Sequence, residues 1–213
     1  VRVIVPFVPG GGADAAGRLF AAKLTDNLGQ QFVIDNRGGA GGVVGAEFAA
    51  KAAPDGYTLF LGTANMAMNV SLYGKRSYDP QKDFATVSPL SSTPNVITVH
   101  PSLPVKTVKE LIALAKAHPD KINYASGGNG STAHLAAELF KSMAHVNLVH
   151  VPYKGSGPAV IAVLSGEAPL TMVPALAVIP FVQSGRLRAL AISSLQRAAA
   201  LPRQAFVRRH ALR

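Results

Sequence analysis

A strand, a glycine-rich turn and a helix follow one another twice in this chain, and this repeated unit constrains the fold most. The first copy contains VPFVPGGGADAAGRLF at residues 5–20, and the second is INYASGGNGSTAHLAAELF at residues 122–140. Strands that alternate with helical segments indicate mostly parallel sheets with helices on both faces. In such α/β proteins ligands lie beyond the carboxyl ends of the strands, where both glycine turns fall. The sequence therefore predicts two α/β lobes whose glycine turns face each other.

Periodicity, helix caps and turn residues predict the remaining elements. We expect strands at residues 2–5, 31–35, 58–62, 95–100, 122–125, 147–151, 170–173 and 187–193, and helices at 13–28, 42–52, 107–118, 132–143, 158–164 and 175–183. The stretch TVHPSLPVKT at residues 98–107 lacks helical periodicity and is the best candidate for a crossing between lobes. We therefore expect lobe 1 in residues 1–99 and lobe 2 in residues 100–194, with crossings near 99–101 and 191–194.

The composition argues against several classes of protein. No cysteine is present, so disulfide and thiolate chemistry are excluded. The apolar stretch at residues 168–182 contains three prolines and is shorter than the roughly 20 residues of a membrane helix. The net charge of +10 is concentrated in residues 186–213, which hold seven arginines and no acidic residue. A nucleic-acid-binding domain spreads its basic residues over a face and adds a recognition element, so we expect no nucleic-acid partner.

The first glycine turn fits two phosphate-binding patterns incompletely. A Walker loop requires a lysine and a hydroxyl residue after its last glycine, and residues 6–17 contain neither. Gly10, Gly12 and Ala15 do satisfy the dinucleotide pattern G-x-G-x-x-A, and Asp35 stands where a ribose-binding carboxylate is expected. Two prolines make this turn longer and stiffer than a dinucleotide turn. An NAD(P)-dependent oxidoreductase that uses the GGGADA loop therefore remains an alternative to a binding protein.

The second glycine turn is suited to binding an anion. Gly127, Gly128 and Gly130 allow the backbone to approach a ligand closely. The helix that follows offers free amides and the positive end of its dipole. Ser131 is the predicted N-cap, and it either caps its own helix alone or also binds the ligand.

The sequence offers little for catalysis or metal binding. Ser131 and His134 lack a G-x-S-x-G elbow and a third residue that would orient the histidine. His145 and His150 do not have the spacing of zinc ligands on a helix, and H-E-x-x-H is absent. We therefore expect no catalytic residue, no metal and no cofactor.

Asp14 is the only ionisable side chain in residues 6–17, and two roles are open to it. At the start of a helix its carboxylate interacts favourably with the dipole and can accept hydrogen bonds from free amides. Alternatively it faces the ligand and pairs with an ammonium or hydroxyl group. In neither role does this loop present a cation, so the sequence predicts that it holds a carboxylate through backbone amides and waters.

Four segments carry a resemblance to a known family. They are VPFVPGGGADAAGRLF, IDNRGGAGGVVGAEFAAKAAPDGYTLFLGT, YASGGNGSTAHLAAELFKSMA and VHVPYKGSGPAV. In this order they resemble the Bug-type substrate-binding proteins of tripartite tricarboxylate transporters, nearly continuously to about residue 202. The resemblance implies the α/β fold of a type II periplasmic binding protein, in which two lobes of mixed, mostly parallel sheets flanked by helices close on a small carboxylate.

The same resemblance implies partners, a location and a set of ligand-binding residues. The ligand would be a di- or tricarboxylate, an acidic amino acid or an aromatic acid, delivered to membrane transporter subunits by a monomeric periplasmic protein whose signal peptide is already absent. The implied ligand-binding residues are Phe7, Gly11, Gly12, Ala13, Asp14, Thr63, Asn65, Gly130, Ser131, Thr132, His134 and Tyr153.

Two departures from the family pattern affect these expectations. Val173 and Pro174 stand where the family carries polar residues that face the ligand, so we expect a polar contact to be lost there. After residue 202 the resemblance ends in an arginine-rich segment. Residues 195–213 are therefore expected to form an incomplete return to lobe 1, which leaves that lobe truncated, and a non-functional remnant is a further alternative.

Overall fold

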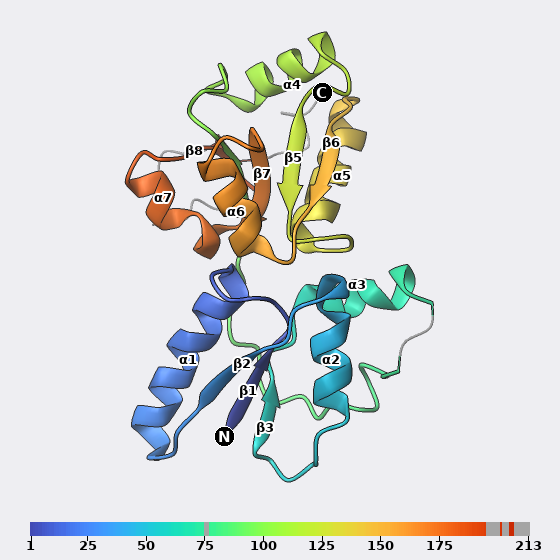
Figure 1. Cartoon of the computed structure of the whole chain (residues 1–213), viewed down its shortest axis with the longest axis vertical. Coiled ribbons are helices and arrows are strands. Elements are labelled where there is room, and N and C mark those ends of the chain that lie inside the picture. Colours follow the sequence, from blue (N-terminus) through green and yellow to red (C-terminus); the bar gives the residue numbers. More distant parts are fainter. Residues whose placement is uncertain (75–76, 195–200, 202–204, 207–213) are drawn as a thin grey trace.

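The computed structural model describes residues 1–74, 77–194, 201 and 205–206, and it consists of two lobes stacked along the long axis of the molecule (Figure 1). The first lobe contains strands β1 (Arg2–Val5), β2 (Val33–Asn36) and β3 (Thr58–Phe60). Its helices are α1 (Gly12–Leu28), η1 (Ala40–Gly42), α2 (Val43–Ala50) and α3 (Ala64–Leu72). The predicted two-lobe α/β architecture is confirmed.

The first sheet is parallel and has the strand order β2-β1-β3. In the central strand β1, Val3, Ile4 and Val5 are buried, because helices cover both faces of the sheet: α1 packs against β1 and β2, and α2 against β1 and β3. Parallel strands end at the same edge of a sheet. The turns after β1 and β3 therefore both lie at the edge that faces the second lobe (Figure 1).

The second lobe is built on a larger, mixed sheet with the strand order β6-β5-β7-β4-β8-β9. Its strands are β4 (Asn95–Val99), β5 (Asn123–Ser126), β6 (Val149–Pro152), β7 (Leu170–Pro174), β8 (Arg188–Ile192) and β9 (Ala205–Phe206). Its helices are α4 (Val108–Ala117), α5 (Thr132–Ala144), α6 (Ser156–Leu164), η2 (Ala175–Ala177) and α7 (Ile179–Gln183). Strand β4 runs antiparallel to both of its neighbours, whereas β5 is parallel to β6 and β7.

Alternating side chains of the second sheet form a core on each face. Tyr124 packs on one face with Leu111 of α4 and Phe140 of α5. Val173 packs on the other face with Val160 of α6 and Ile192 of β8. Both faces are apolar, as expected for a sheet with helices on each side.

Strand β4 corrects the predicted crossing between lobes. The sequence reading ended lobe 1 at residue 99, but β4 is hydrogen-bonded between β7 and β8 inside the second sheet. Val96, Ile97, Thr98 and Val99 are all buried, since both faces of this strand lie against core. The chain therefore passes between the lobes before Asn95, and the prolines that follow belong to a turn within the second lobe.

The C-terminal segment differs from its prediction where the structure describes it. Strand β9 pairs with β8 of the second sheet, and Leu201 is buried in a core of the second lobe. These residues therefore extend the second lobe and do not return to the first, nor does the chain cross at 191–194. The rest of the predicted return segment lies outside the described residues.

Two further predictions need correction. Residues 64–72 form helix α3, where the sequence predicted no helix. The predicted helix at 175–183 is divided into η2 and α7, with Val178 between them in a non-helical conformation.

The core of the second lobe gives a direct test of this packing. Leu111 is completely buried, so replacing it with alanine should lower the free energy of unfolding by about 2–5 kcal/mol. Leu28→Ala is the matched control, because Leu28 is 61% exposed at the end of α1 and should cost far less. Urea denaturation measures both, and equal losses would contradict the packing described here.

Candidate functional site

Glycines bring the two lobes into backbone contact at the first loop, which we define as residues 6–12. A Cβ on Gly157, at the start of α6, would lie 2.9 Å from the carbonyl oxygen of Pro9. A Cβ on Gly12 would lie 3.2 Å from Cβ of Pro174, at the end of β7. The predicted ligand residues Gly11 and Gly12 are therefore buried at the lobe boundary.

Val173 and Pro174, the two residues that depart from the family pattern, have different positions. Val173 is buried in the core of the second lobe, whereas Pro174 contacts the first lobe at Gly12. Only Pro174 therefore lies at the boundary, where its ring packs on the start of α1.

Asp14 holds the first loop in place. Its Oδ2 accepts hydrogen bonds from Gly10 N and from Arg18 Nε, both at 3.0 Å, and its Oδ1 accepts one from Asn36 Nδ2, also at 3.0 Å. The same Asn36 amide group donates to the carbonyl of Phe7 at 2.9 Å. Both carboxylate oxygens are thus bonded within the first lobe, so the geometry supports a role in positioning the loop.

The charge of Asp14 is stabilised in this position. Burial raises the pKa of the Asp14 carboxyl, but the hydrogen bonds from Arg18, Gly10 and Asn36 outweigh burial and leave the pKa below its usual value. Asp14 is therefore ionised at neutral pH, although its residue is only 4% exposed.

The second loop, residues 127–131, ends in a capped helix. Ser131 Oγ accepts a hydrogen bond from His134 N at 3.1 Å, which is the predicted N-cap geometry. Gly130 N donates to His134 Nδ1 at 3.2 Å, so this histidine also supports the loop. Thr132 follows the cap, where the first amides of α5 have no partner within the helix.

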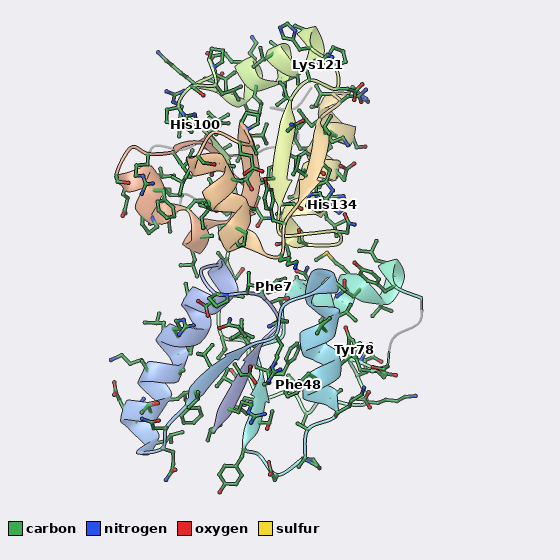
Figure 2. The ribbon with its side chains drawn as sticks, in the orientation of Figure 1. Phe7, Phe48, Tyr78, His100, Lys121 and His134 are labelled. Carbon is green, nitrogen blue, oxygen red and sulfur yellow. The ribbon has the colours of Figure 1, made fainter. Side chains whose placement is uncertain are left out.

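A stack of aromatic rings stands behind the second loop. The His134 ring stacks on His150 of β6 with centroids 4.2 Å apart, and His150 stacks on Tyr124 of β5 at 4.9 Å. His150 Nε2 lies 2.6 Å from Ser126 Oγ, which accepts a hydrogen bond from Gly128 N. His134 (Figure 2) therefore contacts the loop directly, and His150 contacts it through Ser126.

Both histidines are held neutral. Burial, together with the neighbouring His134 and Lys141, lowers the pKa of His150 to about 4. Burial also lowers the pKa of His134, and this effect outweighs the opposing charge of Glu138. Glu138 itself accepts hydrogen bonds from the Tyr124 hydroxyl at 2.7 Å and from Lys141 Nζ at 2.8 Å.

The remaining predicted ligand residues are divided between the lobes. Phe7 lies half-buried at the boundary (Figure 2), and Ala13 is half-buried in the first turn of α1. Thr63 is the N-cap of α3 but makes no side-chain capping bond. Tyr153 donates to Glu167 Oε1 at 2.7 Å within the second lobe, and burial together with this carboxylate raises the pKa of Tyr153 to about 12.

Asn65 connects the lobes directly. Its Nδ2 donates to the carbonyl of Gly41 at 3.2 Å in the first lobe and to that of Gly130 at 3.0 Å in the second. Its neighbour Asn69, which the sequence reading missed, is 1% exposed and also donates to Gly41 O. Two asparagines four residues apart lie on the same face of a helix. This spacing could have indicated a polar face, but only if residues 64–72 had been predicted to be helical.

Cavities elsewhere do not include the predicted ligand residues. One of about 550 Å³ lies at the far end of the first lobe and is lined by Val1, Arg2, Phe48, Lys51, Ala52, Ala53, Tyr57 and Thr58. Another of about 100 Å³ lies between α5 and the second sheet. Among the described residues no three His, Asp or Glu side chains are grouped to hold a metal ion. Within the same residues, no helix has the length and apolar character to span a membrane.

Comparison with known proteins gives a consistent result. Residues 16–210 match the tripartite tricarboxylate transporter family receptor, TctC. BugT of Bordetella pertussis is 41% identical over 204 residues, which is 95% of this chain and 63% of BugT. The periplasmic binding protein BugD has a TM-score of 0.93 at 33% identity, over 97% of this chain and 69% of BugD. An R. palustris protein solved with adipate has a TM-score of 0.94 at 39% identity, over 97% of this chain and 70% of that protein.

The two lobes and their facing glycine loops thus define a periplasmic binding protein fold. Within this class, the chain belongs to the tripartite tricarboxylate transporter receptor family, as the resemblance implied. It spans about 60% of the length of the curated relatives that it matches.

The bonds of Asp14 predict that its charge stabilises the first lobe. Asp14→Asn should lower the free energy of unfolding by about 1–3 kcal/mol, because charge-assisted hydrogen bonds to a buried carboxylate are lost. Asp26→Asn removes an exposed carboxylate on the same helix and serves as the control. Thermal or urea unfolding checks the difference, and equal stability of the two variants would count against the role of Asp14.

The neutral histidine stack predicts a loss of stability in acid. The unfolded chain takes up protons as pH falls below about 6.5, whereas the folded protein keeps His150 neutral until about pH 4. The free energy of unfolding should therefore be highest above pH 6.5 and should fall as pH decreases toward 4.

Urea unfolding at several pH values tests this dependence. His150→Gln should flatten the pH profile between 6.5 and 4. His118→Gln, at an exposed position at the end of α4, should leave the profile unchanged. A profile as steep in His150→Gln as in the wild type would refute the contribution of the stack.

Proposed function

We propose that this chain is an extracytoplasmic receptor that binds a small organic carboxylate between its lobes and delivers it to membrane transporter subunits. The observation that carries this proposal is the convergence of helix N-termini at the lobe boundary. Helices α1 and α2 of the first lobe and α5 and α6 of the second all begin at the edges where the two sheets face each other (Figure 1). Their positive ends favour an anion in this region.

Unused donors support a carboxylate held by the backbone. The N-cap residues of α1, α2 and α6 are Gly11, Gly42 and Gly155, which have no side chain to cap their helices. Val43 N of α2 already donates to Ala40 O, whereas the first-turn amides of α1 and α6 remain available to a ligand. The hydroxyls of Thr63 and Thr132 lie at the start of α3 and α5 and would add side-chain donors.

The energetics of such a site are sufficient. A micromolar affinity corresponds to about 8 kcal/mol. Hydrogen bonds to a charged group contribute roughly 1.5–3 kcal/mol each, so three or four of them offset much of the cost of ordering the ligand and the loops. No cationic side chain is required.

We propose a dicarboxylate as the first ligand to test, because a relative with the same fold was solved with adipate. Phe7, Gly11, Gly12, Ala13, Thr63, Gly130, Ser131, Thr132, His134 and Tyr153 are the proposed ligand-binding set, with Asp14 and Asn65 in supporting positions. Related family members are transport-associated binding proteins, so we propose that the chain performs no chemistry and acts as a monomer in the periplasm.

The oxidoreductase alternative receives less support from the geometry. Asp35 would have to bind a ribose, but its Oδ1 accepts a hydrogen bond from Arg37 Nε at 2.8 Å. A thermal-shift comparison of adipate with NAD separates the two functions, and a shift with NAD alone would overturn the proposal.

Thr132 provides a test of the site itself. Thr132→Val should weaken adipate binding roughly two- to tenfold through loss of one hydrogen bond, with little change in stability. Thr58→Val, at the start of β3 and away from the boundary, is the matched control. Isothermal titration calorimetry measures both variants. An unchanged affinity in Thr132→Val would remove this hydroxyl from the proposed site.

A further inference from the structure

Helix α3 of the first lobe makes side-chain hydrogen bonds to the second loop in the other lobe. Asn65 Nδ2 donates to Gly130 O at 3.0 Å, and Tyr73, directly after α3, donates from its hydroxyl to Asn129 O at 3.3 Å. The acceptors are carbonyls of consecutive residues. One side of α3 is therefore hydrogen-bonded to the backbone of residues 129–130 in the other lobe.

The same face of α3 is also hydrogen-bonded to the η1 turn of the first lobe. Asn65 and Asn69 both donate to Gly41 O at 3.2 Å, so the two asparagines tie α3 to this turn as well as to the other lobe. They are 3% and 1% exposed. Hydrogen bonds that are shielded from water in this way are stronger than exposed ones.

Close packing surrounds these hydrogen bonds between the lobes. Gly130 has φ +72°, and a Cβ there would lie 2.9 Å from Leu72 Cδ1. A Cβ on Gly41 would lie 2.7 Å from Asn129 O. The loop and the turn therefore meet without space for a side chain between them, and the hydrogen bonds form only when the lobes are together.

We propose that Asn65, Tyr73 and the carbonyls of residues 129–130 form a latch that sets how often the receptor is closed. The latch rests on the proposed function, since closure brings the ligand-binding loops together. A ligand that binds the closed state has an apparent affinity reduced by the fraction of molecules that are open. Asn65 and Tyr73 are thus positioning residues that change affinity without touching the ligand.

Both amide hydrogens of Asn65 are engaged, which favours this role over direct ligand binding. They go to Gly41 O and Gly130 O, so the side chain has no donor left for a carboxylate. Sequence resemblance had placed Asn65 among the ligand-binding residues. The two roles differ in one respect: only a latch residue changes the opening of the protein in the absence of ligand.

One buried oxygen atom, Oδ1 of Asn69, makes the closed arrangement less favourable. Asn69 Oδ1 has no hydrogen-bond partner among the described residues, and it lies 3.5 Å from the position of a Cβ on Gly130. Burying an acceptor without a partner is unfavourable, and opening of the lobes would expose this oxygen to water. The gain from the Asn65 and Tyr73 bonds is therefore partly cancelled, and closure stays reversible.

The absence of cysteine permits a direct measurement of opening. Leu28→Cys in the first lobe and Lys121→Cys in the second, both at exposed positions far from the boundary (Figure 2 shows Lys121), accept one spin label each. Pulsed electron paramagnetic resonance then gives the distance distribution between the lobes. Tyr73→Phe removes a single hydroxyl, and Tyr57→Phe, 65% exposed at the far end of the first lobe, is its matched control.

We expect Tyr73→Phe to reduce the ratio of closed to open protein roughly two- to tenfold without ligand, and Tyr57→Phe to leave it unchanged. Asn65→Ala should act in the same direction. Adipate affinity should fall in both latch variants by no more than the measured change in this ratio. Distance distributions identical to the wild type in both variants would overturn the latch. If adipate binds no variant, nor the wild type, the proposed function fails, and the unliganded distributions still decide on the latch.

Discussion

The close approach of backbone to backbone at the lobe boundary is the constraint on which the rest of the arrangement depends. Gly12, Gly41, Gly130 and Gly157 each lie where a Cβ would come within about 3 Å of an atom in the opposite lobe or in the helix that contacts it. Two sheets therefore meet at the edges where their parallel strands end. The helix N-termini then lie opposite one another, and the electrostatics of the boundary come mainly from peptide groups.

Ionisable side chains in this protein support the loops from behind. Asp14 fixes the first loop through Gly10 and Asn36, and the His134–His150 stack supports the second through Gly130 and Ser126. Both supports have a lowered pKa, so at neutral pH Asp14 is ionised although it is buried, and His150 is neutral. Rigid loops of this kind lose little conformational freedom when they bind.

The sequence predicted the two strand–turn–helix units well because their signals are local. Glycines, the Ser131 cap and a continuous helical pattern all lie within a few residues of each other. The crossing was misplaced because the prolines at 101 and 104 resemble a linker, whereas the buried run at 96–99 reveals its place in the second sheet only through pairing with β7 and β8. Helix α3 was missed because Thr63 and Asn65 are also typical turn residues.

The site was predictable in part for the same reason. The loops could be named from their glycines, but Asn36, which binds Asp14, is 22 residues from it, and Gly130, which binds Asn65, is 65 residues from it. No local sequence pattern indicates these long-range pairs. The pairs determine which side chains hold a loop in place and which are left to bind a ligand.

The strand order of the two sheets also has a consequence for how the chain assembles. The three described strands of the first sheet all precede residue 61, and their pairings, Arg2 with Val33 and with Thr58, span less of the chain than those of β4. The central strand β4 of the second sheet instead pairs with strands much later in the chain. Asn95 pairs with Pro174 of β7, and Val96 pairs with Ile192 of β8. Contacts of such large sequence separation form slowly. During synthesis these three strands of the first lobe can therefore pair early, while β4 has no partners until β7 and β8 have left the ribosome.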